Sequence, residues 1–160
     1  MRAPELTTLC YLERDGAYLM LHRNRKKEDV NAGKWIGVGG HFEPSESPED
    51  CMKREIYEET GLTVTSWRFR GIVTFLTDGG ICEYMHLFTC DAWQGEEIPC
   101  DEGDLEWVEK SRVPSLPLWE GDRIFLDLIA RSSPFFSLKL SYHGDRLVSA
   151  ELDGKPLAVG

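Results

Sequence analysis

The cysteines and histidines of this sequence lack the spacings that bind zinc. The five cysteines, at positions 10, 51, 82, 90 and 100, form no C-x-x-C pair, and their odd number does not suggest a complete disulfide framework. The four histidines, at positions 22, 41, 86 and 143, show no H-x-x-x-H spacing. We therefore expect reduced, structural thiols and no histidine-based zinc centre.

Long apolar runs are also absent. No stretch approaches the roughly 18 apolar residues of a membrane span, and the N-terminus, MRAPELTTLC, lacks the basic and apolar regions of a signal peptide. The sequence contains no internal repeat, low-complexity segment or Pro/Ser-rich linker. With 160 residues and 41% hydrophobic content, it predicts one cytosolic domain, residues 1–160, around one substantial core.

Positive charge is scarce. The 18 basic residues are outnumbered by 28 acidic ones, which gives a net charge of -10. This balance argues against binding to the phosphate backbone of DNA or RNA. A smaller polyanionic substrate would need cations to bridge it, which favours a metal.

The glycines of the stretch WIGVGGHF form neither of the two common nucleotide motifs. Gly37, Gly39 and Gly40 fit neither G-x-G-x-x-G nor G-x-x-x-x-G-K-[ST], so a Rossmann or P-loop fold is not predicted. Glycine at these positions still lets the backbone approach a ligand closely. We expect a short strand or bend here.

Alternating apolar residues and turn signals predict a mainly β framework. Asp15-Gly16, Asp78-Gly79-Gly80 and His143-Gly144-Asp145 each separate two β-prone runs and predict hairpins. The expected strands are 6–13, 17–23, 62–77, 81–93, 105–113, 135–142 and 146–152. A helix with Ile124, Phe125, Leu128 and Ile129 at helical spacing should cover the sheet. The predicted fold class is an α/β sandwich with a central mixed β-sheet.

A second helix is predicted over residues 48–60. Ser47 suits the N-cap, Pro48 suits the first helical position and Gly61 suits the position after the C-terminus. At about 100° per residue, Glu55, Glu58 and Glu59 fall on one side of this helix. Met52 and Ile56 lie alongside them to pack inward.

This glutamate cluster has two interpretations. Like charges four residues apart destabilise an exposed helix by a few tenths of a kcal/mol per pair, and no basic residue lies within the cluster. A divalent cation bound by carboxylate oxygens would explain it, and such hard ligands suit Mg²⁺ or Mn²⁺. An acidic, solvated helix face explains the spacing about equally well.

A longer pattern favours the metal. From Gly40 the sequence reads one glycine, five residues, Glu46, seven residues and then REIYEETGL, residues 54–62. This pattern resembles the signature of the Nudix hydrolases, G-x5-E-x7-R-E-U-x-E-E-x-G-U with U an aliphatic residue, at every specified position. The resemblance implies an α/β/α sandwich and Mg²⁺-dependent hydrolysis of a nucleoside diphosphate linked to another group.

The resemblance also implies roles for individual residues. Glu55, Glu58 and Glu59 would be metal ligands or, for one of them, the general base, and the Gly39 carbonyl would add a ligand. Arg54 would orient the glutamates through charge-assisted hydrogen bonds, and Glu46 would brace the turn before the helix. Glu102, in CDEGDLEW, is the expected further acidic residue of the catalytic and metal site.

The order of elements is similar to that of the MutT-type enzymes, which clear oxidised purine triphosphates such as 8-oxo-dGTP. In that subgroup a tryptophan followed by acidic residues faces the base, and the matching residues here are Trp119 and Asp122, with Gly121 where some relatives carry another aspartate. A core anchor and an N-terminal helix charge are the alternative roles for these two residues. Ile36 stands where some of these enzymes have a base-contacting asparagine.

The polar stretch NRKKEDVNAGKW is expected to be a loop. Together with the preceding Arg23 it carries Arg25, Lys26, Lys27 and Lys34. These cations, Arg23 and Lys34 above all, could attract an anionic substrate, or they could simply be solvated.

These observations predict a Nudix pyrophosphohydrolase that splits a nucleoside triphosphate, an oxidised purine first of all, into monophosphate and pyrophosphate, in nucleotide-pool sanitation. Alternatives are a Nudix hydrolase of dinucleoside polyphosphates or nucleotide sugars, and a Nudix domain that only senses nucleotides. Isopentenyl diphosphate isomerases share the scaffold, but the motif here is the unbroken hydrolase form.

Overall fold

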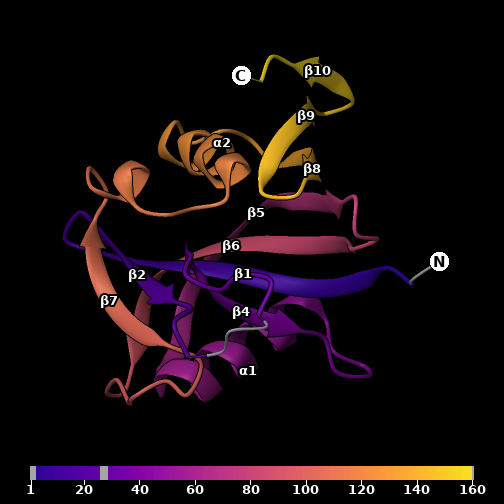
Figure 1. The fold of residues 1–160 in the computed structure, drawn as a ribbon. Helices are drawn as coiled ribbons and strands as arrows, with labels where there is room; N and C mark the ends of the chain where they lie inside the picture. Colours follow the sequence, from indigo (N-terminus) through magenta and orange to yellow (C-terminus); the bar gives the residue numbers. More distant parts are fainter. Residues whose placement is uncertain (1–2, 26–28, 160) are drawn as a thin grey trace.

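A computed structural model describes residues 3–25 and 29–159 (Figure 1). Lys26 and Lys27 of the predicted basic loop lie outside the described residues. The described chain contains two α-helices, a 3₁₀ turn and ten strands in one sheet. The strands are β1 (Glu5–Arg14), β2 (Ala17–His22), β3 (Trp35–Ile36), β4 (Val38–His41), β5 (Thr63–Thr77), β6 (Cys82–Gln94), β7 (Asp104–Glu109), β8 (Phe136–His143), β9 (Arg146–Leu152) and β10 (Lys155–Leu157). The helices are α1 (Pro48–Thr60) and α2 (Glu120–Ala130), and the 3₁₀ turn η1 is Val113–Ser115.

The sheet is mixed, and strand β1 lies near its middle. The strand order is β10-β9-β8-β5-β6-β1-β2-β3, with β4 also paired to β1 and β7 to β2. β1 is parallel to β6, and β5 is parallel to β8, while the other pairs are antiparallel. On its second edge, β1 pairs with β4 through Thr7–Cys10 and with β2 through Leu12–Arg14. This change of partner places the glycine-rich strand β4 beside the N-terminal half of β1.

The two helices cover opposite faces of the sheet, as Figure 1 shows with α2 above and α1 below the strands. Alternate residues of β1 supply the two cores because successive strand side chains point to opposite faces. Leu9 and Tyr11 pack into the cluster that contains α2, and Cys10 and Leu12 into the cluster that contains α1. The predicted α/β sandwich is confirmed.

The predicted elements form with three differences. The strand expected over residues 105–113 is β7, which ends at Glu109, and Val113 instead begins the 3₁₀ turn, where Pro114 cannot donate to a sheet. Ile124 of α2 is half-buried, whereas Phe125, Leu128 and Ile129 are buried. Strand β10 was not predicted, because three residues that include Pro156 give a weak strand signal.

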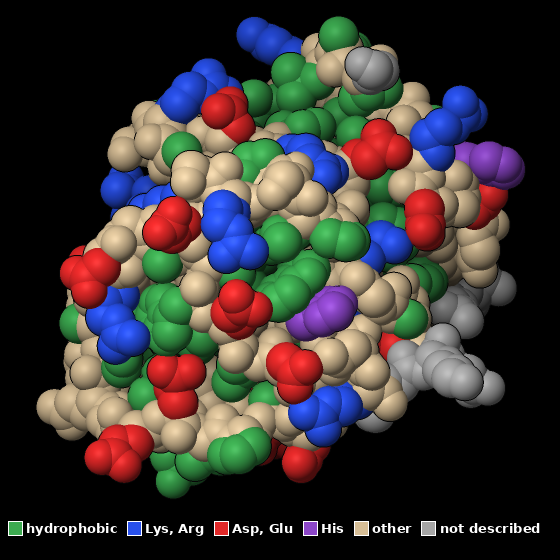
Figure 2. All heavy atoms as spheres, turned by 60° about the vertical axis from the view of Figure 1, so that its left-hand side comes forward, with side chains coloured by type: hydrophobic (Ala, Val, Ile, Leu, Met, Phe, Trp, Pro, Cys, Tyr) green, Lys and Arg blue, Asp and Glu red, His purple; other side chains and the backbone are tan. Residues whose placement is uncertain are grey.

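Neither described helix has the length and apolar character needed to cross a bilayer. Figure 2 shows the left-hand side of Figure 1 turned forward, where acidic, basic and hydrophobic side chains are interspersed. This face therefore does not carry a continuous basic surface.

Candidate active site

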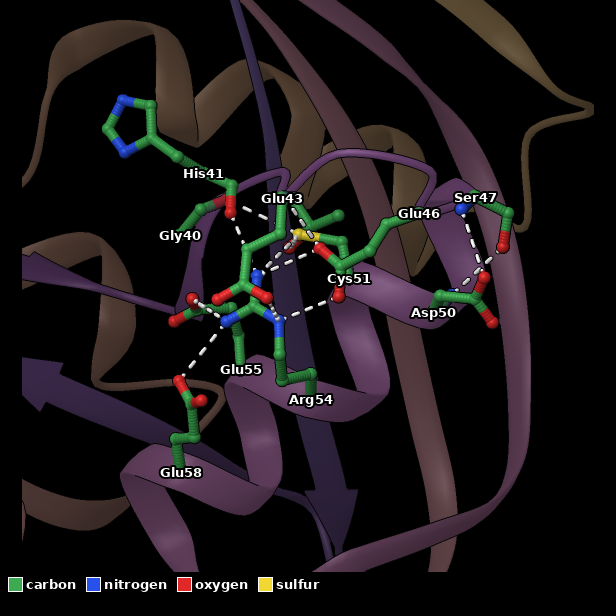
Figure 3. A network of polar contacts seen from close by, with 11 residues as sticks. Gly40, His41, Glu43, Glu46, Ser47, Asp50, Cys51, Arg54, Glu55 and Glu58 are labelled. Carbon is green, nitrogen blue, oxygen red and sulfur yellow. Dashed lines mark hydrogen bonds and ion pairs between the residues drawn. The ribbon is translucent and has the colours of Figure 1, made fainter.

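Side chains and one glycine define both ends of helix α1. The Ser47 hydroxyl accepts a hydrogen bond from the Asp50 N–H (3.0 Å), and the Asp50 carboxylate accepts one from the Ser47 N–H (3.1 Å), as Figure 3 shows. This capping box satisfies two N–H groups that have no partner within the helix. At the other end, Gly61 takes the left-handed conformation (φ 79°), and its N–H donates to the Tyr57 carbonyl.

The buried face of α1 sets the direction of its glutamates. Met52 and Ile56 are completely buried against the sheet. This packing fixes the rotation of the helix, so that Glu55 and Glu58 line a cavity and Glu59 lies beneath it, only 7% exposed. The three glutamates therefore differ in exposure: Glu58 is exposed, Glu55 is half-buried and Glu59 is buried.

Strand β4 has glycine at two positions where a side chain would meet a neighbour. A Cβ added to Gly40 would lie 2.5 Å from the carboxyl carbon of Glu55, and one added to Gly39 would lie 1.9 Å from the Thr8 carbonyl oxygen. The Gly39 N–H donates to Oε2 of Glu59 (3.1 Å). The two glycines thus allow the backbone of β4 to contact the glutamates directly.

Arg54 connects the acidic residues of the motif (Figure 3). Its guanidinium donates to both carboxylate oxygens of Glu46 (2.7 and 2.9 Å), to Glu55 (2.6 Å) and to Glu58 (3.1 Å), and also to the His41 carbonyl (2.9 Å). Only a guanidinium supplies this many N–H donors in one plane. Arg54 therefore hydrogen-bonds two of the three helix glutamates.

Glu46 joins the turn before α1 to this network. One of its oxygens accepts the Glu43 N–H (2.7 Å), and both accept N–H groups of Arg54. The hydrogen bonds from Arg54 hold the pKa of Glu46 below its usual value. The expected bracing role of Glu46 is confirmed.

Glu59 is the most buried carboxyl group of the cluster. Its Oε1 is buried with no hydrogen-bond partner among the described residues. Burial, reinforced by the neighbouring carboxyls of Glu102 and Glu55, raises the pKa of Glu59 to about 11. Burial also raises the pKa of Glu55, although Arg54 opposes that shift. Without a cation, Glu59 therefore keeps its proton at neutral pH, because water cannot stabilise its charge.

The donor chemistry of these residues suits a divalent cation, while the described group whose ligand atoms already lie within 4.8 Å of one another is Glu5, His41 and Glu83. The donors are hard oxygens, which Mg²⁺ and Mn²⁺ prefer, and the unpartnered Oε1 of Glu59 offers a lone pair that no described protein group uses. A cation at this position would neutralise the carboxylates that repel one another. The residues that would hold it are Glu55, Glu58, Glu59 and Glu102, together with the carbonyl of Gly39.

Arg23 and Glu102 meet at the wall of the cavity, although 79 residues separate them. Arg23 donates to Glu102 (2.9 Å) and to Asp29 (2.5 Å). Arg23 therefore lines the cavity with its charge balanced by two carboxylates. The hydrogen bond from Arg23 holds the Glu102 carboxylate beside the glutamates of α1.

The cavity, of about 560 Å³, extends from the glutamates to the start of α2. This volume is in the range of nucleotide-sized ligand sites. Trp119 and Asp122 line its far end, with Ile36 and Phe75 among the apolar side chains there. The two residues predicted to face a base thus share one cavity with the acidic cluster.

Trp119 and Asp122 are buried as well as accessible to the cavity, each with 4% of its surface exposed. The rings of Phe75 and Tyr142 contact the Trp119 indole edge to face, both with centroids 5.0 Å away. Burial raises the pKa of Asp122 to about 8, and the positive charges of Arg123 and Lys34 oppose the shift. The core and ligand-facing interpretations of Trp119 are therefore compatible.

Lys34 does not line the cavity. Its ammonium lies over the Trp119 ring, 4.4 Å from the centroid, and pairs with Asp145 at 3.1 Å. Lys34 thus supports the tryptophan from outside the ligand space.

The sequence did not indicate two further features of the cavity wall. Asn31 accepts a hydrogen bond from the Trp119 indole N–H (2.8 Å). At the rim, His41 and Glu83 line the cavity and, with Glu5, have ligand atoms within 4.8 Å of one another. Glu5, His41 and Glu83 share no motif spacing. They lie together because β1 pairs with both β4 and β6.

The model of the NUDIX domain family matches residues 3–129. The chain belongs to the Nudix family. It is 30% identical over 152 residues to an uncharacterised Nudix hydrolase, YvcI, of Bacillus subtilis, covering 91% of this chain and 92% of that protein. It is also 30% identical over 155 residues to the oxidized purine nucleoside triphosphate hydrolase of Danio rerio, covering 96% and 97% of the two chains.

A solved structure shows the same fold. The crystal structure of the mutator MutT protein from Bacillus halodurans superposes with a TM-score of 0.83 at 30% identity, over 95% of this chain and 99% of that one. As a Nudix hydrolase, the protein acts on substrates that contain a nucleoside diphosphate linked to another group. Nudix hydrolases generally use a divalent metal, and the acidic cluster of α1 lies at the Nudix motif.

Proposed function

We propose that this Nudix hydrolase converts a purine nucleoside triphosphate, above all an oxidised one such as 8-oxo-dGTP, and one water into the monophosphate and pyrophosphate. The main support is that one cavity contains both the carboxylates of the Nudix helix and, at its far end, Trp119 and Asp122. A triphosphate needs a cation-binding end and an apolar, hydrogen-bonding end for the base. The similarity to the oxidized purine nucleoside triphosphate hydrolase of Danio rerio favours the same substrate class.

Different residues have different roles in this reaction. Glu55, Glu58, Glu59 and Glu102, with the Gly39 carbonyl, would hold Mg²⁺, or Mn²⁺ in its place. When bound, such an ion neutralises phosphate oxygens and acidifies water. A carboxylate of this group receives the proton of the attacking water. Arg54 keeps Glu55 and Glu58 in position during the reaction, because both carboxylates are hydrogen-bonded to its guanidinium before the substrate binds.

At the other end, Trp119 and Asp122 would bind the base. An indole stacks favourably on a purine, and a carboxyl group hydrogen-bonds to ring N–H groups. Such a reaction removes damaged nucleotides before a polymerase can use them, which is nucleotide-pool sanitation.

The test is hydrolysis with Mg²⁺ of 8-oxo-dGTP, dGTP, dATP, a dinucleoside tetraphosphate and ADP-ribose, followed by separation and quantification of the nucleotide products and compared by kcat/KM. We expect the highest kcat/KM for 8-oxo-dGTP. The matched variants are Glu58→Gln, which should lower kcat on every substrate, and Trp119→Ala, which should mainly raise KM. Preferred turnover of the tetraphosphate or ADP-ribose would overturn the proposal in favour of another Nudix substrate. Binding without any turnover would indicate a nucleotide sensor.

A further inference from the structure

Asn31 lies at the base end of the cavity, in the loop between β2 and β3, and lines it together with Trp119 and Asp122. The indole N–H of Trp119 is a donor only, so the group that faces it must be the amide oxygen of Asn31. The amide nitrogen, with its two N–H donors, is therefore turned away from Trp119. Among the described residues, no acceptor binds that nitrogen.

The loop holds Asn31 in one position. Its backbone N–H donates to the Asp29 carboxylate (3.0 Å), and its carbonyl accepts the Lys34 N–H (2.8 Å). Asp29 is in turn fixed by Arg23, the residue that also orients Glu102. These contacts fix the backbone of Asn31, and the hydrogen bond from Trp119 orients its side-chain amide, so less entropy is lost when the amide binds a ligand.

Two other hydroxyls of the cavity wall, nearer to β4, are already engaged. The Thr8 hydroxyl contacts the sulfur of Cys51 (3.4 Å), and the Thr7 hydroxyl donates to Glu83 (3.3 Å). Ile36 offers no polar atom. The Asn31 amide and the Asp122 carboxyl are two polar groups that line the cavity beside Trp119.

We infer that Asn31 is a specificity-determining residue, whose amide N–H groups bind the 6-oxygen of a purine base and select 6-oxopurine over 6-aminopurine nucleotides. This inference rests on the proposed function and adds the class of base. Guanine presents a carbonyl at position 6 and N–H donors beside it, which suit the amide of Asn31 and the carboxyl of Asp122. Adenine presents an amino group at position 6, which would set donor against donor and leave both unpaired.

The 6-oxygen is present in both guanine and 8-oxoguanine. Asn31 should therefore favour dGTP and 8-oxo-dGTP over dATP by a similar factor. Discrimination between the first two must come from other contacts.

The decisive variant is Asn31→Asp, which keeps an oxygen for the Trp119 N–H and replaces the donor group by an acceptor. We expect kcat/KM for dGTP and 8-oxo-dGTP to fall by a common factor of at least about tenfold, mainly through KM. The kcat/KM for dATP should fall less than these values, or rise. Gln94→Glu makes the same amide-to-carboxylate change on the exposed end of β6 and serves as the charge control.

Asn31→Ala removes the amide oxygen and nitrogen without adding a charge. It therefore separates the loss of the amide from the effect of the negative charge in Asn31→Asp. It should also narrow the preference for dGTP over dATP, measured as the ratio of their kcat/KM values. An equal loss on dGTP and dATP in both variants, at wild-type thermal stability, would overturn the inference while the proposed function stands. If the wild-type protein hydrolyses none of these triphosphates, the proposed function itself fails.

Discussion

Replacing Glu59 by glutamine should stabilise the metal-free protein although it removes a central carboxylate of the site. Glu59 is 7% exposed, and its folded-state pKa is about 11 against an ordinary value of 4.5. Between these two pH values the folded protein retains a proton that the unfolded chain releases. Stability therefore falls as the pH rises above 4.5.

The size of this effect follows from the pH. At pH 7 the unfolded chain gains about 3 kcal/mol from ionising this group while the folded protein keeps it neutral. At pH 5 the same difference is only about 1 kcal/mol. In Glu59→Gln the amide oxygen can still accept the Gly39 N–H, and the amide nitrogen can donate to the neighbouring carboxyls of Glu55 and Glu102.

The assay is urea unfolding with a chelator present at pH 5, 6 and 7. We expect Glu59→Gln to exceed the wild type in unfolding free energy by about 3 kcal/mol at pH 7 and by about 1 kcal/mol at pH 5. Glu58→Gln is the matched control, because the Glu58 side chain is 55% exposed. Saturating Mg²⁺ should shrink the advantage of Glu59→Gln, since the ion stabilises the wild type. Equal stabilities at pH 7, or a difference that does not change with pH, would refute the reasoning.

Three further predictions concern the two ends of the cavity. Tyr142→Phe removes the hydroxyl that accepts the buried Gly121 N–H (2.7 Å), so the free energy of unfolding should fall by about 1–2 kcal/mol. An unchanged midpoint of urea unfolding would show that this hydrogen bond does not stabilise the protein. Asp122 is mostly neutral below its pKa of about 8 and ionised above it. The KM of the wild type should therefore change between pH 7 and pH 9, while the KM of Asp122→Asn should not. If the KM of both proteins depends on pH in the same way, Asp122 does not contact the base. Arg54→Lys keeps the charge but loses the paired hydrogen bonds to Glu46, so kcat should fall by about 10- to 100-fold, and a wild-type Mg²⁺ dependence would exclude the positioning role.

Local interactions made much of this protein predictable. Ser47, Pro48 and Gly61 mark the ends of α1 because caps act on the backbone of their own neighbours. The hairpin turn at Asp15-Gly16 was readable for the same reason, since both residues adopt positive φ, which few residues tolerate. The Nudix pattern, confined to 23 consecutive residues, carried the family and the acidic cluster.

Contacts between distant segments were beyond such reasoning. The pairing of Arg23 with Glu102 spans 79 residues, and that of Trp119 with Asn31 spans 88. Lys34 and Arg23 looked alike in the sequence, yet Arg23 lines the cavity and Lys34 lies outside it.

The sequence by itself determined the helix, its caps and the spacing of its glutamates, because each depends on residues within a turn or two. Only the tertiary structure decided that Glu59 is buried and Glu58 exposed. It also decided that one cavity joins the acidic cluster to Trp119 and Asp122, and that Asn31 lines that cavity beside Trp119. The physical reason is that burial, and the shifts in pKa that follow from it, depend on which strands lie side by side, and no local pattern records that.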